Sequence, residues 1–108
     1  MKAIIVAAFG GPEVLRVEEI ADPAPEAGQV RVRIQAIGVN PYDTYMRSGK
    51  YGIKPTLPYS PGADAAGIVD AVGDGVADWK VGDRVYVGGT IANPAYGVSA
   101  ERVLCFPQ

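Results

Sequence analysis

The chain has 108 residues, of which 48% are hydrophobic, and its 10 Lys and Arg against 12 Asp and Glu give a formal net charge of −2. This length suits one domain with a single core. Charges of both signs are interspersed, so no basic face is available to follow phosphates, and nucleic-acid binding is not expected. No stretch reaches the ~20 apolar residues of a membrane-spanning helix, and we expect a cytoplasmic protein without a membrane partner.

The first predicted elements are strands. Ala3–Ala8 is a short continuous apolar run, which is typical of a strand buried on both faces. The turn that follows it has none of the character of a processing site. Leu15–Glu18 and Val30–Ala36 alternate between apolar and polar residues, and the second of these segments places its arginines on the solvent face.

One helix is predicted, over Pro41–Ser48. Asn40 is a good N-cap, proline suits the first helical position, and Asp43 places a carboxylate in the first turn. Gly49 then offers a left-handed stop. The helix is therefore expected to span about two turns.

The predicted helix and the loop after it hold candidate site residues. Asn40 either only caps the helix, or its amide also points into a cleft and orients a polar group on a ligand. Tyr45, which shares one side of the helix with Tyr42 and Met46, is either a core ring or an exposed phenol that stacks on a flat ligand. Tyr51 is the kind of loop aromatic that closes over a pocket.

Three more strands are predicted after the helix, over Ala65–Val72, Arg84–Val87 and Arg102–Phe106. Fourteen glycines and nine prolines, placed mainly between these segments, suit short strands that bend around a barrel. Asp64 stands among small residues, so its carboxylate is either buried with a partner or exposed at a cleft. The turn at Gly73–Gly75 lacks the third glycine and the helix of a nucleotide-binding fingerprint.

Cysteine and histidine usage excludes several kinds of site. The sequence contains no histidine, and Cys105 is its one cysteine. An intrachain disulfide, a zinc site of the usual Cys/His type and a Ser-His or Cys-His nucleophile pair are therefore ruled out. Cys105 lies in an apolar run and is expected to be an inert buried residue. We predict no metal site.

Taken together, four segments resemble the N-terminal catalytic domain of the medium-chain dehydrogenase/reductase superfamily. The likeness is to its zinc-free, zeta-crystallin-like quinone oxidoreductase branch. The segments follow the order of that family and cover nearly the whole chain. They are Phe9–Leu15, Gly38–Pro41 with Thr44–Gly49, Pro58–Gly67, and Val72–Gly75 with Lys80–Val85.

This resemblance implies a mainly β fold over residues 1–108, namely a GroES-like, partly open β-barrel with one or two short helices. It implies a parent enzyme that passes hydride from NADPH to a quinone or another electrophilic substrate without zinc. NADPH would be bound mainly by a Rossmann domain beyond this chain, so the 108 residues alone are expected to turn over little. The resemblance assigns Tyr45 to the cofactor, and Asn40 and Tyr51 to the quinone pocket as catalytic residues.

Two other functions stay open from the sequence. A non-catalytic β-barrel module would self-assemble through exposed strand edges, which would make a homo-oligomer. Another zinc-free reductase, such as an enoyl reductase, would use the same barrel, because a fold does not determine a substrate. Residues 91–101 depart from the family's pattern by being a few residues short, and no fold is predicted for them.

Overall fold

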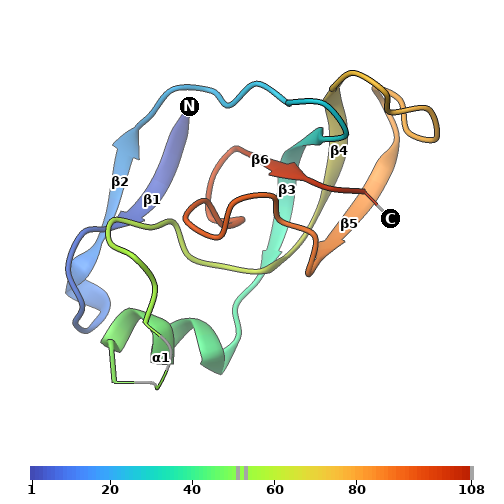
Figure 1. Cartoon of the computed structure of the whole chain (residues 1–108). Helices are drawn as coiled ribbons and strands as arrows, with labels where there is room; N and C mark the ends of the chain where they lie inside the picture. Colours follow the sequence, from blue (N-terminus) through green and yellow to red (C-terminus); the bar gives the residue numbers. More distant parts are fainter. Residues whose placement is uncertain (51, 53, 108) are drawn as a thin grey trace.

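The structure is a computed structural model that describes residues 1–50, 52 and 54–107, and the statements below refer to these residues. Strands dominate it, as the sequence predicts, and α1 has the predicted bounds (Figure 1). The predicted strands are confirmed with shifts of one or two residues at their ends. The elements are β1 (Lys2–Val6), the 3-10 turn η1 (Pro12–Val14), β2 (Leu15–Glu19), β3 (Val30–Gly38), α1 (Pro41–Ser48), β4 (Asp64–Val72), β5 (Arg84–Gly88) and β6 (Arg102–Cys105).

The strands form two antiparallel sheets that do not close into one barrel (Figure 1). One sheet pairs β1 with β2, and the other has the order β5-β4-β3-β6. Backbone hydrogen bonds join the small sheet to two distant segments: the Val6 N–H donates to the Tyr59 carbonyl and the Ile4 N–H to the Ser99 carbonyl, both at 2.8 Å. The expectation of a mainly β, partly open barrel is confirmed.

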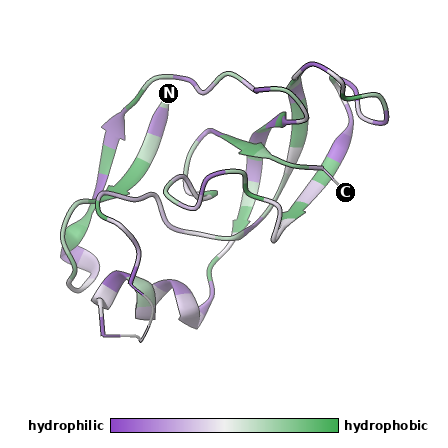
Figure 2. Ribbon diagram, viewed as in Figure 1, coloured by the Kyte–Doolittle hydropathy of each residue, from purple (hydrophilic) through white to green (hydrophobic). Residues whose placement is uncertain are grey.

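The core lies on one face of the four-stranded sheet. Alternation along β3 places Val30 and Val32 in it, and β5 alternates in the same way, which is visible as changing colour along that strand in Figure 2. Helix α1 is mostly purple and white in the same view and has no buried residue. The buried cluster consists of Val30, Val32, Val69, Val87, Val98, Val103 and Cys105.

Two predicted details of the strands are wrong. The first strand ends at Val6 rather than Ala8, and Ala7 and Ala8 are exposed. In β3, Arg33 is exposed as predicted, but Arg31 is only partly exposed because its guanidinium is engaged in an ion pair. Alternation along a strand predicts the face on which a side chain lies. The contacts that the side chain makes on that face determine how much of it is exposed to solvent.

An ion-pair network crosses three neighbouring strands of the large sheet. Asp70 of β4 accepts from Arg31 Nε at 2.7 Å and from Arg102 Nε at 2.9 Å. The register explains why one carboxylate meets both arginines. Arg31 pairs with Ala71 and Val32 with Val69, so Asp70 is the extra residue of a β-bulge, which re-aims its side chain.

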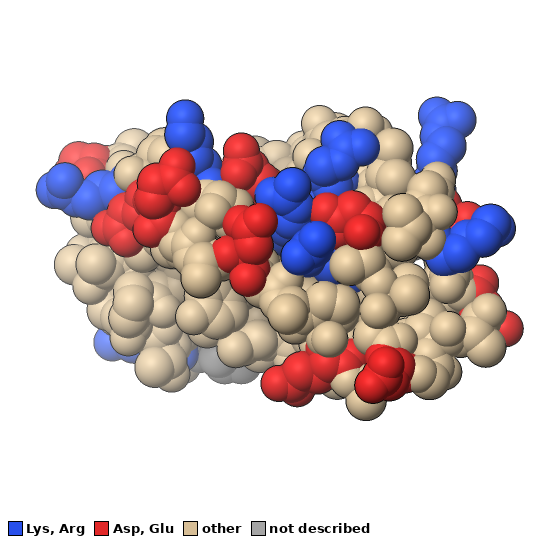
Figure 3. Space-filling model, turned by 90° about the horizontal axis from the view of Figure 1, so that it is seen from above, with Lys and Arg blue, Asp and Glu red and all other residues tan. Residues whose placement is uncertain are grey.

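The surface seen in Figure 3 carries both charge signs side by side, with uncharged surface between them. This face therefore has no extended positive patch that would attract a polyanion, as expected from the interspersed charges of the sequence. Within the part of the chain that the structure describes, no helix is long and apolar enough to cross a membrane.

Candidate functional site

A cleft of about 680 Å³ lies between α1 and two loops. Helix α1 contributes Tyr42, Asp43 and Met46 to it, and the other walls are the segments 54–63 and 89–95. The walls combine aromatic, apolar and polar groups, which is the usual make-up of a site for a small organic molecule. We therefore take this cleft and its rim as the candidate functional site.

Local signals at both ends explain the helix that borders the cleft. Asn40 at the N-cap has an extended backbone, with φ −112° and ψ 154°, and Pro41 begins the helix. Gly49 ends it in the left-handed region at φ 69°. This glycine is also required for packing, because a Cβ there would lie 2.5 Å from Cγ of Phe9. The predicted helix bounds and caps are confirmed.

Asn40 is held by two carboxylates. Its backbone N–H donates to Asp43 Oδ2 at 2.9 Å, and its side-chain Nδ2 donates to Asp64 Oδ2 at 2.7 Å. The side chains of Asn40 and Asp43 stand in the capping-box arrangement, in which each faces the other's backbone N–H, although only the contact to Asp43 Oδ2 forms a well-shaped hydrogen bond. Asp64 fits neither of its two interpretations fully, since its carboxylate has Asn40 as a partner but is exposed, and it is not among the residues that line the cleft.

Tyr45 does not line the cleft together with its neighbours on the helix. Tyr45 is 49% exposed, so its ring is not part of the core. Tyr42 and Met46 line the cleft, whereas Tyr45 is not among the lining residues, so the three do not face it as one set. Tyr51, the other predicted pocket residue, lies outside the described residues. Of the three predicted site residues, Asn40 and Tyr45 belong to α1 and its cap, and neither is among the residues that line the cleft.

Sequence reasoning assigned no site role to Tyr59. Its side chain lines the cleft and is only 4% exposed, and its hydroxyl is buried without a hydrogen-bond partner in the described structure. Burial raises the pKa of the Tyr59 phenol, with an opposing effect of Arg47 and a reinforcing one of Asp43. Pro58 and Pro61, which stand on either side of Tyr59, were the sequence signal of a rigid backbone at this aromatic.

Replacing Tyr59 with phenylalanine is expected to raise the free energy of unfolding by about 1 kcal/mol, because the substitution removes a buried hydroxyl that has no partner to lose. Urea unfolding of both proteins measures this. Tyr86→Phe is the matched control, since Tyr86 is 86% exposed and its hydroxyl is expected to contribute little. A loss of stability in Tyr59→Phe would mean that the hydroxyl is bonded, and the prediction would be wrong.

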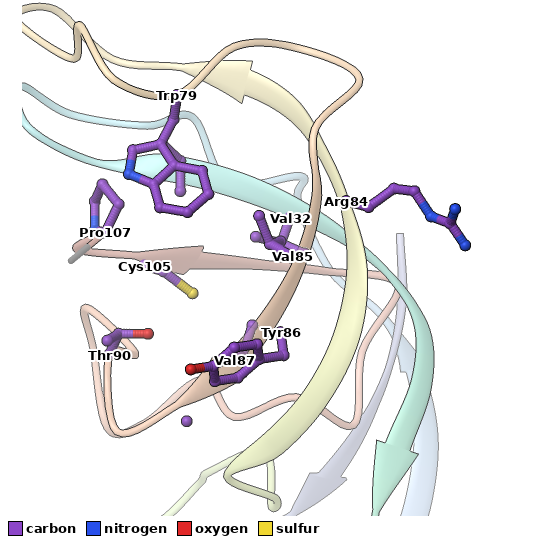
Figure 4. Close-up of a pocket in the computed structure, with 11 residues that line it drawn as sticks. Val32, Trp79, Arg84, Val85, Tyr86, Val87, Thr90, Cys105 and Pro107 are labelled. Atoms are coloured by element: carbon purple, nitrogen blue, oxygen red, sulfur yellow. The ribbon is translucent and has the colours of Figure 1, made fainter.

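A second hollow, of about 230 Å³, lies over the large sheet and is shown in Figure 4. Val32, Val85 and the Trp79 ring border it, and the Arg84 side chain points away. The Cys105 thiol faces this hollow and is buried, and burial raises the pKa of the thiol, so it stays protonated at neutral pH. The expectation of a buried cysteine is confirmed.

The segment 91–101, for which no fold was predicted, forms part of the cleft wall and is held by backbone contacts. Single β-bridges link Ile91 to Cys105, Tyr96 to Ser60, and Ala100 to Ala3. Gly97 is required at its closest approach, because a Cβ there would meet the backbone carbonyls of residues 60–62 at about 2.5 Å. The shortened segment is thus bonded to strands at both ends.

With this geometry established, comparison with known proteins shows where similar chains occur. Residues 26–105 match the family described as "Alcohol dehydrogenase GroES-like domain". A quinone oxidoreductase of Lama guanicoe is 49% identical over 107 residues, which cover 96% of this chain and 32% of the relative. The crystal structure of Escherichia coli quinone oxidoreductase complexed with NADPH aligns with a TM-score of 0.85 at 40% identity, over 98% of this chain and 31% of that one.

A further relative, a quinone oxidoreductase of Rattus norvegicus, is 53% identical over 93 residues, which are 85% of this chain and 28% of the relative. The chain therefore spans about a third of the length of the curated relatives that it matches. The similarity extends over almost the whole of the 108 residues, including both the cleft and the two sheets.

Proposed function

Because this chain belongs to the alcohol dehydrogenase GroES-like domain family, within the quinone oxidoreductase branch of the medium-chain dehydrogenase/reductase superfamily, we propose that it is the N-terminal part of an NADPH-dependent quinone oxidoreductase that works without zinc. The observation that carries the proposal is the identity of about half the residues with quinone oxidoreductases over 107 positions. The cleft beside α1 agrees with it, since that cleft has the size and lining that a small planar ring requires.

In the proposed enzyme, the residues of this chain position two rings. The exposed Tyr45 ring fits the flat nicotinamide end of NADPH, against which it would stack. The chain has no phosphate-binding glycine loop, so the residues present fit that end of the cofactor only. The cofactor, when bound, supplies the hydride. Asn40 would orient the quinone, the role also proposed for Tyr51, and the cleft walls would keep water from both rings.

Zinc independence is a separate part of the proposal. In zinc-dependent members of the superfamily, a cysteine near the position of Asn40 and a histidine near that of Ala63 hold the metal. This chain has neither residue at those positions and contains no histidine. Instead, a hydrogen bond from Asn40 to Asp64 joins the start of α1 to the start of β4.

The test is oxidation of NADPH by tetramethyl-1,4-benzoquinone, which has no open ring position for thiols or amines to attack. We expect activity in the longer protein that carries this chain and none in the 108 residues alone, because hydride transfer needs both rings held at near-attack distance. Oxidation of NADPH by the 108 residues alone would contradict the prediction that a further domain is needed. A longer protein that reduces no quinone, but does reduce an enone, would favour the enoyl reductase alternative.

Tyr45→Ala in the longer protein is expected to weaken NADPH binding about tenfold, through the loss of ring stacking, while leaving the unfolding midpoint nearly unchanged. Fluorescence titration with NADPH measures the Kd. Tyr86→Ala is the matched control, because Tyr86 is a still more exposed tyrosine on a different element, β5. Equal NADPH affinity in the two variants would refute the cofactor role of Tyr45.

A further inference from the structure

The amide of Asn40 has one orientation available to it. A carboxylate only accepts hydrogen bonds, so the NH2 end of the amide must face Asp64, where Nδ2 donates to Oδ2 at 2.7 Å. The carbonyl end then lies on the side of the Asp43 N–H, in the capping-box arrangement. Nδ2 carries two hydrogens, and Asp64 accepts one of them. The second N–H is directed away from Asp64.

The backbone brings Asp64 to this point. Asp64 is the first residue of β4 and pairs with Gly38, the last residue of β3, two positions before Asn40. A Cβ on Gly38 would lie 3.3 Å from the Asp64 Cβ, so the absence of a side chain there leaves room for the carboxylate to reach Asn40. Asp43 and Ala63, which stand close to the bonded pair in the chain, line the cleft, whereas Asn40 and Asp64 are not among its lining residues, so the hydrogen bond lies beside the cleft.

We propose that Asp64 is a positioning residue, which holds the Asn40 amide so that its second N–H is presented as a hydrogen-bond donor to an oxygen of the bound quinone. This inference rests on the proposed function, and it assigns Asp64 a role that acts through Asn40. The hydrogen bond is exposed, and exposed polar pairs contribute little to folding. Its main effect is therefore on the direction of the amide rather than on stability.

Asp64→Asn is the informative substitution. It keeps the size of the side chain, but an amide both donates and accepts, so Asn40 is no longer forced into one orientation. In the longer protein we expect kcat/KM for tetramethyl-1,4-benzoquinone to fall about tenfold, mainly through KM, with an unchanged unfolding midpoint. Asp64→Glu should restore most of the loss, and Asp78→Asn, which removes an exposed charge elsewhere, should have no effect.

A spectroscopic readout separates this inference from the enzyme's activity. In the 15N-labelled chain, the Asn40 side-chain N–H bonded to Asp64 should resonate downfield of the other Asn and Gln amides, and this shift should be lost in Asp64→Asn. The other Asn40 N–H should shift when tetramethyl-1,4-benzoquinone is added to the longer protein. An Asn40 amide that is unchanged by Asp64→Asn would overturn the proposal, as would unchanged quinone kinetics in an active enzyme.

If the longer protein reduces no quinone, two outcomes remain distinct. A quinone-induced shift of the Asn40 N–H that disappears in Asp64→Asn would uphold the positioning role and refute the catalytic proposal. The absence of any such shift in the parent would refute both.

Discussion

Gly67→Ala is expected to lower the free energy of unfolding by about 3 kcal/mol, because overpacking at a rigid site is costly. Gly67 is buried in β4 and pairs with Ile34 of β3. A Cβ at this position would lie 2.2 Å from the backbone carbonyl oxygen of Arg33 and 2.9 Å from Cγ1 of Val32. Since the first of these atoms belongs to the backbone, the clash cannot be relieved by a change of rotamer.

The register explains why β3 comes so close to Gly67. Ile34 pairs with Gly67 and Ala36 with Ala66, so Gln35 is an extra residue on β3 and the strand bends beside this glycine. Gly88→Ala is the matched control, because an added Cβ at Gly88 on β5 would meet no atom within 4 Å. That substitution is expected to change the stability by no more than about 0.5 kcal/mol. Equal urea midpoints for the two variants would contradict the prediction.

Asp70→Ala is expected to cost about 2 kcal/mol of unfolding free energy. Removing one partner of a buried ion pair costs about 3–5 kcal/mol, and we expect less here because these side chains are partly exposed. The carboxylate of Asp70 is 19% exposed and accepts from both Arg31 and Arg102. Without this carboxylate, the guanidinium groups of Arg31 and Arg102 on adjacent strands lose a shared negative charge and repel each other.

Asp78→Ala controls for the loss of one negative charge, since Asp78 is exposed in the loop before β5 and shows no ion pair within the described structure. Urea unfolding at low and at high salt measures both variants. We expect the cost of Asp70→Ala to persist at high salt, because partly buried pairs are screened less than exposed ones. A cost no larger than that of Asp78→Ala would show that the network does not stabilise the sheet.

The elements that the sequence predicted well are those specified by neighbouring residues. The bounds of α1 follow from Asn40, Pro41 and Gly49, whose effects reach only the adjacent turn. The alternation in β3 predicted its buried valines for the same reason, since side chains of a strand alternate between two faces. For Asn40 and Tyr45, by contrast, the local pattern left two interpretations open, and their site roles came from the family resemblance.

The features that only the tertiary structure revealed are those that depend on contacts between residues distant in sequence. The extra residues Asp70 and Gln35 are invisible in the strand pattern, because a bulge is defined by the register of two paired strands. The sequence left two interpretations of Asp64 open, because its partner became known only when folding brought the start of β4 to the start of α1. Tyr59 received no site role from the sequence, because the cleft that it lines is formed jointly by its own segment, α1 and the loop at 89–95. Local hydrogen bonding and alternation thus determine the elements and their caps, whereas the direction of a site's side chains is determined by contacts between elements that chain folding brings together.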